Sequence, residues 1–257
     1  DRSVSRGLGD VYKRQVTNDA KITVNGKEIE LSALLEKWTA PLEKVFPTKA
    51  EVPEIEVDVP LYSERNTSSP AIKTAKPTVF IPVFPGTNCE VDTARAFEKA
   101  GANVEMLIVK NLSSNDIEET IDEMEKLIAK SQMIMLPGGF SGGDEPDGSG
   151  KFIATTFRNP RIAEQVNNLL KNRDGLMLGI CNGFQALIKL GLVPYGEIRE
   201  LKANDPTLTF NTIGRHISHM AYTRVTSVKS PWFANVNAGD VFAVPVSHGC
   251  LLYTSPS

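Results

Sequence analysis

Four continuous apolar runs, each followed by a segment with helical spacing, dominate the middle of the chain. The runs TVFIPVF, NVEMLIV, QMIMLP and GLMLGI begin at Thr78, Asn103, Gln132 and Gly175. Runs of this length are typical of strands buried on both faces, and strands that alternate with helices form a parallel sheet. The pattern predicts an α/β fold, a mostly parallel sheet with helices on both faces. Ligands of such sheets bind at the carboxyl ends of the strands.

The segments after these runs place their apolar residues at helical spacing. They predict one helix that starts after an Asn88 cap and ends at Gly101, and further helices at Asn115–Lys130, Arg161–Lys171 and Asn182–Leu190. The chain beyond them changes to shorter strand-like pieces, of which Phe242–Val246 is the last.

Composition restricts the class of protein. The 257 residues are 41% hydrophobic and 23% charged, which is ordinary for a globular chain, and no apolar run approaches the roughly 20 residues that span a bilayer. A formal charge of −3 argues against a nucleic-acid-binding surface. Three cysteines do not make a disulfide framework. We therefore expect a cytoplasmic protein without a membrane or nucleic-acid partner.

The segment before the first apolar run divides into two parts. KITVNGKEIEL alternates around Asn25-Gly26, which predicts a hairpin, and a short amphipathic helix opened by Ser32 follows. A hairpin and one helix cannot bury a core alone, so residues 16–50 are expected to be the end of a larger domain. Residues 51–77 are rich in Pro, Ser, Thr and charge and predict an extended linker.

The two ends of the chain are related at the level of coding sequence. Codons for Asp10–Gln15 have a reverse complement that, read one base out of frame, encodes Cys250–Thr254. Inverted complements of this kind are typical of translated sequencing adapter, whereas natural termini would match only by accident. We therefore expect residues 1–15 and 250–257 to lie outside the fold.

Cys181 stands at the carboxyl end of the fourth apolar run, directly before a predicted helix. Gly179 and Gly183 flank it, and small flanking residues allow the backbone to turn sharply. The amino terminus of a helix favours a thiolate and leaves N–H groups that can stabilise an oxyanion. Cys181 is therefore predicted to be a nucleophile; a buried structural cysteine is the alternative.

The pattern Gly-x-Cys-x-Gly-x-Gln of Gly179–Gln185 resembles the nucleophile elbow of the class I glutamine amidotransferases. LPGGFS before Gly142 and the histidine after FAVPVS resemble two further motifs of this class. The resemblance implies a flavodoxin-like sheet and a site without metal: catalytic Cys181 and His248, oxyanion-hole N–H groups of Gly139 and Asn182, glutamine-binding Gln185 and Phe140, and elbow glycines Gly179 and Gly183.

Within this class, residues 78–249 resemble the glutaminase domain of the phosphoribosylformylglycinamidine synthases. The likeness rests on Phe84–Ala102, Leu136–Asp144, Gly179–Pro194, Asn211–Arg215 and Pro245–Gly249. Residues 16–50 are similar to the end of the synthetase part in the large, fused form of these enzymes, and the linker would join the two parts.

The resemblance implies a reaction and its partners. Glutamine would be hydrolysed to glutamate and ammonia. The synthetase domain of the same polypeptide would use the ammonia for the ATP-dependent conversion of formylglycinamide ribonucleotide to formylglycinamidine ribonucleotide in purine biosynthesis. ATP and magnesium would bind that missing part, and no cofactor is expected in this chain.

One departure from the class pattern bears on activity. The class carries a Glu two residues after its catalytic histidine, and Cys250 stands there. We therefore expect an impaired or inactive site. Two alternatives remain open: an amidotransferase subunit that serves another synthetase, and a catalytically inactive docking fragment.

Other candidate sites are weak. His216 and His219 lack a third metal ligand nearby, and Cys89 is expected to be a packed small residue. The acidic loop Asp144–Asp147 lacks the ligand spacing of a calcium loop and is expected to be a solvated turn.

Overall fold

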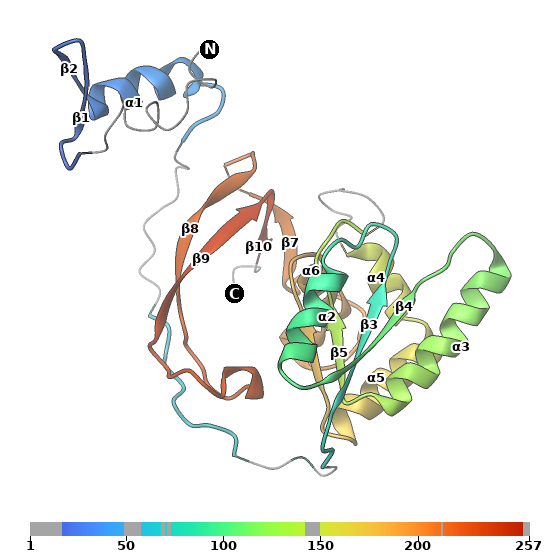
Figure 1. Ribbon diagram of the computed structural model, residues 1–257. Helices are drawn as coiled ribbons and strands as arrows, with labels where there is room; N and C mark the ends of the chain where they lie inside the picture. The colour runs from blue at the N-terminus through green and yellow to red at the C-terminus, as the bar shows by residue number, and fades with distance from the viewer. Residues whose placement is uncertain are drawn as a thin grey trace, which may run out of the picture. The chain divides into compact units, whose positions relative to one another are not determined.

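The computed structural model describes residues 17–48, 58–67, 70, 73–141, 150–211 and 213–253 (Figure 1). The chain divides into two compact units, Asp1–Ile55 and Glu56–Ser257, which are described separately. Three predicted segments lie wholly or partly outside the described residues: the adapter-like ends, much of the linker, and the acidic loop Asp144–Asp147.

The smaller unit contains the predicted hairpin and helix. Strands β1 (Lys21–Val24) and β2 (Lys27–Glu30) pair antiparallel, and both turn residues have positive φ, 50° at Asn25 and 75° at Gly26. A two-residue turn of this kind matches the twist of a hairpin. Helix α1 (Leu31–Thr39) begins one residue before Ser32 and buries none of its residues.

The larger unit is built on a four-stranded parallel sheet. The strands lie in the order β4-β3-β5-β6, with bounds β3 (Thr78–Val83), β4 (Asn103–Ile108), β5 (Met133–Leu136) and β6 (Leu176–Gly179). Each pair is parallel and each strand lies within a predicted apolar run. The α/β fold with a parallel sheet is therefore confirmed.

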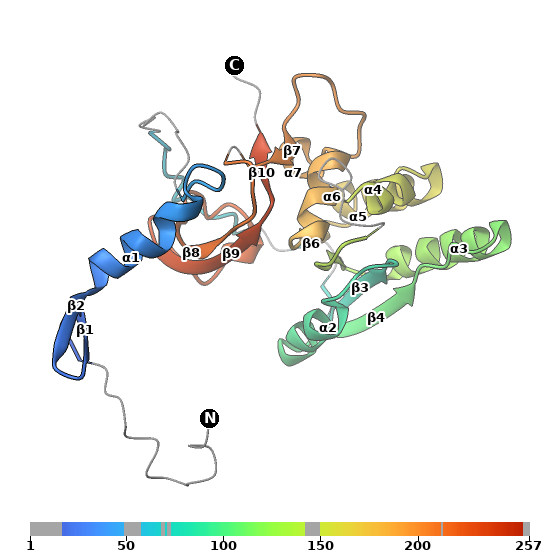
Figure 2. The same cartoon turned by 90° about the horizontal axis from the view of Figure 1, so that it is seen from above.

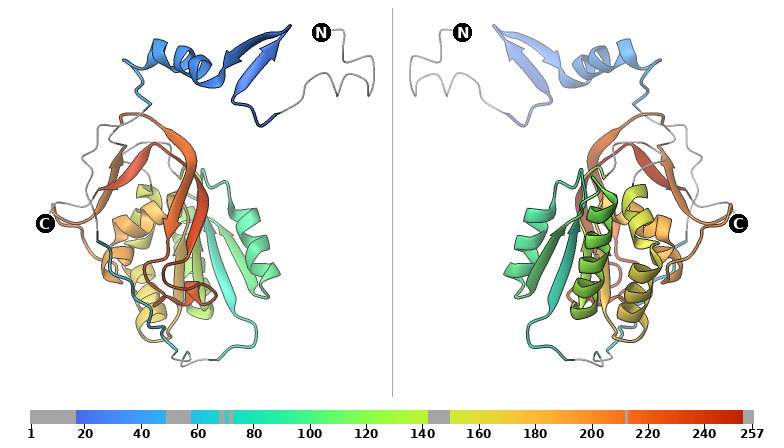
Figure 3. Two further views of the ribbon diagram at one scale, coloured as in Figure 1. Left: turned by 90° about the vertical axis from the view of Figure 1, so that its left-hand side faces the viewer. Right: turned by 90° about the vertical axis from the view of Figure 1, so that its right-hand side faces the viewer.

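Helices cover both faces of this sheet unequally (Figure 3). Alternate residues of a strand point to opposite faces, and accordingly Phe80 packs in one apolar cluster and Val79 in another. The first cluster includes side chains of α3 (Ser114–Lys130), α4 (Lys151–Phe157), α5 (Pro160–Lys171) and α6 (Asn182–Leu190). The second is covered by α2 (Glu90–Lys99) through Ala94 and Phe97. None of the helices within the described ranges is long and apolar enough to cross a membrane.

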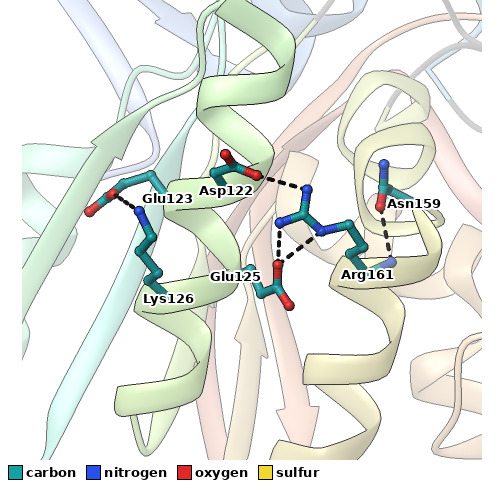
Figure 4. Close-up of polar contacts among 6 residues, drawn as sticks. All are labelled: Asp122, Glu123, Glu125, Lys126, Asn159 and Arg161. Carbon is teal, nitrogen blue, oxygen red and sulfur yellow. Dashed lines mark hydrogen bonds and ion pairs between the residues drawn. The ribbon is translucent and has the colours of Figure 1, made fainter.

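An ion-pair cluster joins α3 and α5 on the surface (Figure 4). The guanidinium of Arg161 contacts Glu125 and lies 2.7 Å from Asp122. The hydrogen bonds that the guanidinium donates, first to Asp122 and then to Glu125, raise the pKa of Arg161 above its ordinary value. Asn159 caps α5 by accepting a hydrogen bond from the N–H of Arg161. Because these charges are about half exposed, the cluster adds little to stability and mainly sets the register of the two helices.

The chain after α6 returns to strands, but two of them are longer than the short pieces that the sequence pattern predicted: β8 (Ile217–Arg224) and β9 (Val241–His248) have 8 residues each. Helix α7 (Leu192–Tyr195) follows α6 directly, then β7 (Thr207–Phe210) and the antiparallel pair of β8 and β9. Figures 1 and 2 both show β8 and β9 on the side of the unit opposite β4. Cys250–Tyr253 form β10 and pair with β7, although residues 250–257 were expected to lie outside the fold. The pairing is a backbone contact and leaves open how these residues are encoded.

Part of the predicted linker is bound to the larger unit. The backbone of Tyr62 pairs with Ser227, with its N–H donating to Thr226 O at 2.8 Å. The guanidinium of Arg65 donates to the carbonyl oxygens of Phe233 and Val236. We call residues 61–65 the strap, because they hold the loop that connects β8 to β9.

A polar cluster beyond α6 gives the larger unit a pH-dependent contact. Tyr195 donates a hydrogen bond of 2.6 Å to Asp205, and Arg199 contacts both oxygens of the same carboxylate. The Tyr195 hydrogen bond first, and then the backbone N–H of Lys202, lower the pKa of Asp205 to about 2.

This contact should lose its stabilising effect in acid. The pKa of Asp205 in the folded protein lies below its ordinary value of 3.8, so the contribution is complete above that value and is lost as the pH falls toward about 2. Tyr195→Phe removes the main partner, so the difference in unfolding free energy between this variant and the parent should shrink as the pH falls through that range. Urea unfolding at a series of pH values measures it, and a constant difference would contradict the assignment.

Candidate active site

The predicted elbow is a sharp turn between β6 and α6. Cys181 has φ 51° and ψ −108°, an unusual conformation for a residue with a side chain. The N–H of Ile180 donates to Leu136 O on β5, and the N–H of Gly183 donates to Ile180 O. These two hydrogen bonds hold the turn on both sides of Cys181. The residue with the strained backbone is therefore the one that carries the exposed thiol.

The two flanking glycines are required by close packing. A Cβ on Gly183 would lie 2.0 Å from Leu136 O, and one on Gly179 would lie 2.7 Å from the carbonyl of Gly183. Helix α6 therefore starts in direct contact with the backbone of β5. No larger side chain fits at either position without moving a buried strand.

The loop after β5 is paired to the turn after β3. The N–H of Phe140 donates to Gly86 O at 2.8 Å, and the N–H of Asn88 donates to Gly138 O at 3.1 Å. Between these bonds, Thr87 and Gly139 face each other in an antiparallel bridge. In such a pair the facing residues direct their own N–H and C=O groups away from each other. The N–H of Gly139 is therefore turned away from the Gly86–Asn88 turn.

The same loop touches the cysteine. A Cβ built on Gly138 would lie 3.4 Å from Cβ of Cys181 and 3.4 Å from Sγ of Cys89. The structure thus brings the predicted oxyanion loop next to the predicted nucleophile. It also places Cys89 as the N-cap of α2, so the expected Asn88 cap is wrong: the N–H of Asn88 belongs to the loop pairing instead. Cys89 is exposed, so the expectation that it is a packed residue is wrong as well, because the turn after β3 leaves it at the surface.

The side chain of Asn182 connects the elbow to this loop. Its Oδ1 accepts hydrogen bonds from the N–H of Ser141 at 3.1 Å and from the Ser141 hydroxyl at 2.6 Å. Its Nδ2 donates to Oε1 of Gln185 at 3.1 Å, and both Asn182 and Ser141 are buried. The sequence pattern assigned a role only to the backbone N–H of Asn182, and the part played by its side chain and by Ser141 was not predicted. The available signal was the position of Ser141 at the end of the LPGGFS motif.

Of the two residues predicted to contact glutamine, Phe140 lies in the loop after β5 and is about half exposed. Gln185 lies one turn into α6, partly buried, and its N–H donates to Cys181 O. Asn182 thus follows Cys181 directly and Gln185 is hydrogen-bonded to its backbone, whereas Gly139 and Phe140 come after Gly138, whose Cβ position borders the cysteine.

His248 lies at the end of β9, paired with Ile217. Its Nδ1 lies 2.9 Å from Oδ1 of Asn211, a buried residue after β7. Among the described residues, no hydrogen bond joins His248 to Cys181. The arrowheads of β3 and β9 both point toward the top of Figure 1, so the two strands end at the same end of the unit. Across the described ranges, no group of three His, Cys, Asp or Glu side chains could hold a metal ion.

The part of the chain that forms this site matches a known protein family. The family model of the CobB/CobQ-like glutamine amidotransferase domain matches residues 76–256. The chain belongs to this family. The match covers the elbow, the Gly138–Ser141 loop and His248, and it includes β10.

Individual relatives carry a more specific name. The chain is 34% identical over 165 residues to the phosphoribosylformylglycinamidine synthase subunit PurQ of Dehalococcoides mccartyi, covering 64% of this chain and 58% of that protein. It is 33% identical over 172 residues to the PurQ subunit of Cereibacter sphaeroides, covering 67% and 64%. The chain thus spans less than two thirds of the length of either relative. Among solved structures, it is similar to PurLQS from Thermotoga maritima, with 27% identity, 70% of each chain covered and a TM-score of 0.49.

Proposed function

We propose that the larger unit is a glutaminase that hydrolyses L-glutamine to glutamate and ammonia. The observation that carries the proposal is the elbow: an exposed thiol at a positive φ, directly before a helix and in contact with Gly138. This is the arrangement that an attacking cysteine requires, since the thiol is accessible and stands at the amino terminus of α6, where backbone N–H groups lack partners within the helix. Membership of a glutamine amidotransferase family supports glutamine as the substrate.

Each residue has a defined role in this mechanism. The thiolate of Cys181 attacks the side-chain amide carbon of glutamine, and N–H groups of Gly139 and Asn182 hold the oxyanion, each contributing about 3 kcal/mol. His248 accepts the thiol proton and delivers it to the departing ammonia; water then hydrolyses the thioester. The proton transfer requires Nε2 of His248 to reach Sγ of Cys181, a contact we expect to form when glutamine binds.

We further propose that the ammonia serves phosphoribosylformylglycinamidine synthesis, as the names of the PurQ relatives indicate. In this proposal the chain is part of the large, fused form, with residues 16–50 from the synthetase, 51–77 as linker and 78–249 as the glutaminase domain. ATP and magnesium would bind the synthetase part of the polypeptide, in the cytoplasm. Residues 1–15 and 250–257 would be translated adapter. The uninterrupted transcript sequence upstream of Val16 tests the fused form, because it should encode an ATP-binding synthetase.

Glutaminase activity is tested with the purified chain. Glutamine should release ammonia and form a γ-glutamyl thioester on Cys181 that mass spectrometry detects after acid quenching. Asparagine, one methylene shorter, should do neither. Release should be slow, because Cys250 stands where the family carries a Glu. Absence of both ammonia and thioester at saturating glutamine, in the chain and in its Cys250→Glu variant alike, would overturn the proposal.

A glutamate at position 250 should raise the activity. The family places a carboxylate two residues after the catalytic histidine, where it stabilises the imidazolium, and Cys250 provides none. Cys250→Glu is therefore expected to increase kcat at least about tenfold. Cys250→Gln, which matches the size but not the charge, should not reproduce the gain, and equal rates for the two variants would contradict the charge-based explanation.

A further inference from the structure

Asn211 is a buried amide whose polar atoms all have partners. The residue follows β7 and is only 4% exposed. Its backbone N–H donates to Gly249 O at 3.0 Å, and its backbone oxygen accepts from the N–H of Gly214 at 2.9 Å. Its side chain reaches the backbone beside His248 and the imidazole ring itself. It is therefore held in one position by the segment that directly follows it and by the end of β9.

The surrounding carbonyl groups determine how the amide is turned. Nδ2 lies 2.9 Å from Arg215 O and 2.8 Å from His248 O. Carbonyl oxygens only accept hydrogen bonds, so the NH₂ group must face both of them and uses its two hydrogens there. The opposite orientation would place Oδ1 against two carbonyl oxygens. Oδ1 therefore faces Nδ1 of His248, at 2.9 Å.

This orientation determines the tautomer of His248. Oδ1 is an acceptor, so the neutral ring must carry its hydrogen on Nδ1, which leaves the lone pair on Nε2. His216 on the neighbouring segment is different: its Nε2 lies 2.8 Å from the hydroxyl of Ser247, which can donate or accept. The contrast shows that the constraint on His248 comes from the Asn211 amide and not from the sheet in general.

We propose that Asn211 is a positioning residue that holds His248 in the Nδ1–H tautomer, with Nε2 free to accept a proton. The tautomer follows from the geometry alone, whereas its catalytic consequence rests on the proposed glutaminase function. Asn211 provides the acceptor that orients a general base, as a neutral asparagine can do in cysteine hydrolases. An uncharged amide stabilises an imidazolium less than a carboxylate does, so the proposal fits a slow rather than absent reaction.

The tautomer can be measured directly in the full chain. The chain contains three histidines, so ¹⁵N-histidine labelling gives few signals, and His248→Gln assigns the one of interest. At a pH where the ring is neutral, ¹⁵N–¹H spectra should show His248 with its hydrogen on Nδ1. Asn211→Leu should shift it to the Nε2–H tautomer that free histidine prefers. Ser247→Ala, which removes the partner of His216, should leave the His248 tautomer unchanged.

Asn211→Asp provides a second comparison, because it keeps an acceptor toward Nδ1; its other oxygen faces the carbonyl groups of Arg215 and His248, so this variant is expected to be less stable than the parent. Asn211→Asp should retain the Nδ1–H tautomer, and it provides a test if Asn211→Leu fails to fold. An Nε2–H tautomer in the parent chain, or an unchanged Nδ1–H tautomer in a folded Asn211→Leu, would overturn the proposal.

Kinetics distinguish positioning from a purely structural role. Asn211→Leu should lower kcat for glutamine at least about tenfold and change KM less than about twofold, because the base acts after substrate is bound. A variant that has a changed tautomer and the same kcat as the parent chain would refute the proposed catalytic effect of Asn211. A parent chain with the Nδ1–H tautomer and no ammonia release would instead refute the glutaminase and leave the positioning of His248 supported.

Discussion

Replacement of Cys181 by alanine is expected to lower ammonia release from glutamine at least about a thousandfold, whereas replacement of Cys89 should leave the rate within about twofold. The thiol is the only group of the elbow that can form a covalent bond to the amide carbon, so its loss removes the reaction path. The two thiols form a matched pair, because both are exposed and both border the Cβ position of Gly138. A coupled assay for ammonia on the parent chain and both variants measures the effect.

The comparison of the two variants also distinguishes loss of the nucleophile from contamination by another glutaminase and from general damage to the loop. Contaminating glutaminase activity would persist in Cys181→Ala, and general damage to the loop would appear in both. Equal activity in the two variants would show that Cys181 is not the nucleophile. Loss of activity only in Cys89→Ala would assign the chemistry to the turn after β3.

Replacement of Gly86 by alanine is expected to lower kcat about a hundredfold, the usual effect of losing one oxyanion donor. A Cβ on Gly86 would lie 2.3 Å from Phe140 O, so the Gly86–Asn88 turn and the loop after β5 would have to separate. That movement changes the direction of the Gly139 N–H, which their pairing fixes. KM should change little, because the developing oxyanion is bound more strongly than the amide of glutamine.

Gly101 offers a control with nearly the same positive φ. Its φ is 94°, against 92° for Gly86, and no atom lies within 4 Å of the Cβ position. Alanine should therefore introduce the same local strain at both positions, with a collision only at Gly86. Gly101→Ala should keep kcat within about twofold, as steady-state rates would show. An equal decrease in both variants would mean that strain, and not the orientation of Gly139, limits the reaction.

The sheet and its helices could be predicted because their signal is local. Each strand lies in an apolar run, and α6 has the predicted bounds Asn182–Leu190. The start of α2 was misplaced because the cap of a helix depends on hydrogen bonds outside it: the N–H of Asn88 is engaged by Gly138, 50 residues along the chain.

The polar contacts of the site could be predicted only in part. Gly179 and Gly183 could be predicted, because a tight turn at Cys181 needs small residues close to it in the sequence. The hydrogen bonds of Asn182 to Ser141 and of Asn211 to His248 join residues 41 and 37 positions apart. Both asparagines stand in motifs that the sequence shows, but neither spacing is periodic, so no sequence pattern indicates which side chain each amide would contact.

The strap determines where a force on the upstream chain would act. Along the chain, Tyr62 and Arg65 come before Thr78, where β3 begins. These two residues are bound to the loop between β8 and β9. A pull on the chain before residue 58 therefore loads that loop before it loads the parallel sheet. Strand β9 starts at that loop and carries His248 at its other end, and Trp232 of the same loop donates a hydrogen bond to Met177 O on β6, the strand that leads to Cys181. The mechanical connection therefore leads both to the proposed catalytic base and to the strand that carries the nucleophile.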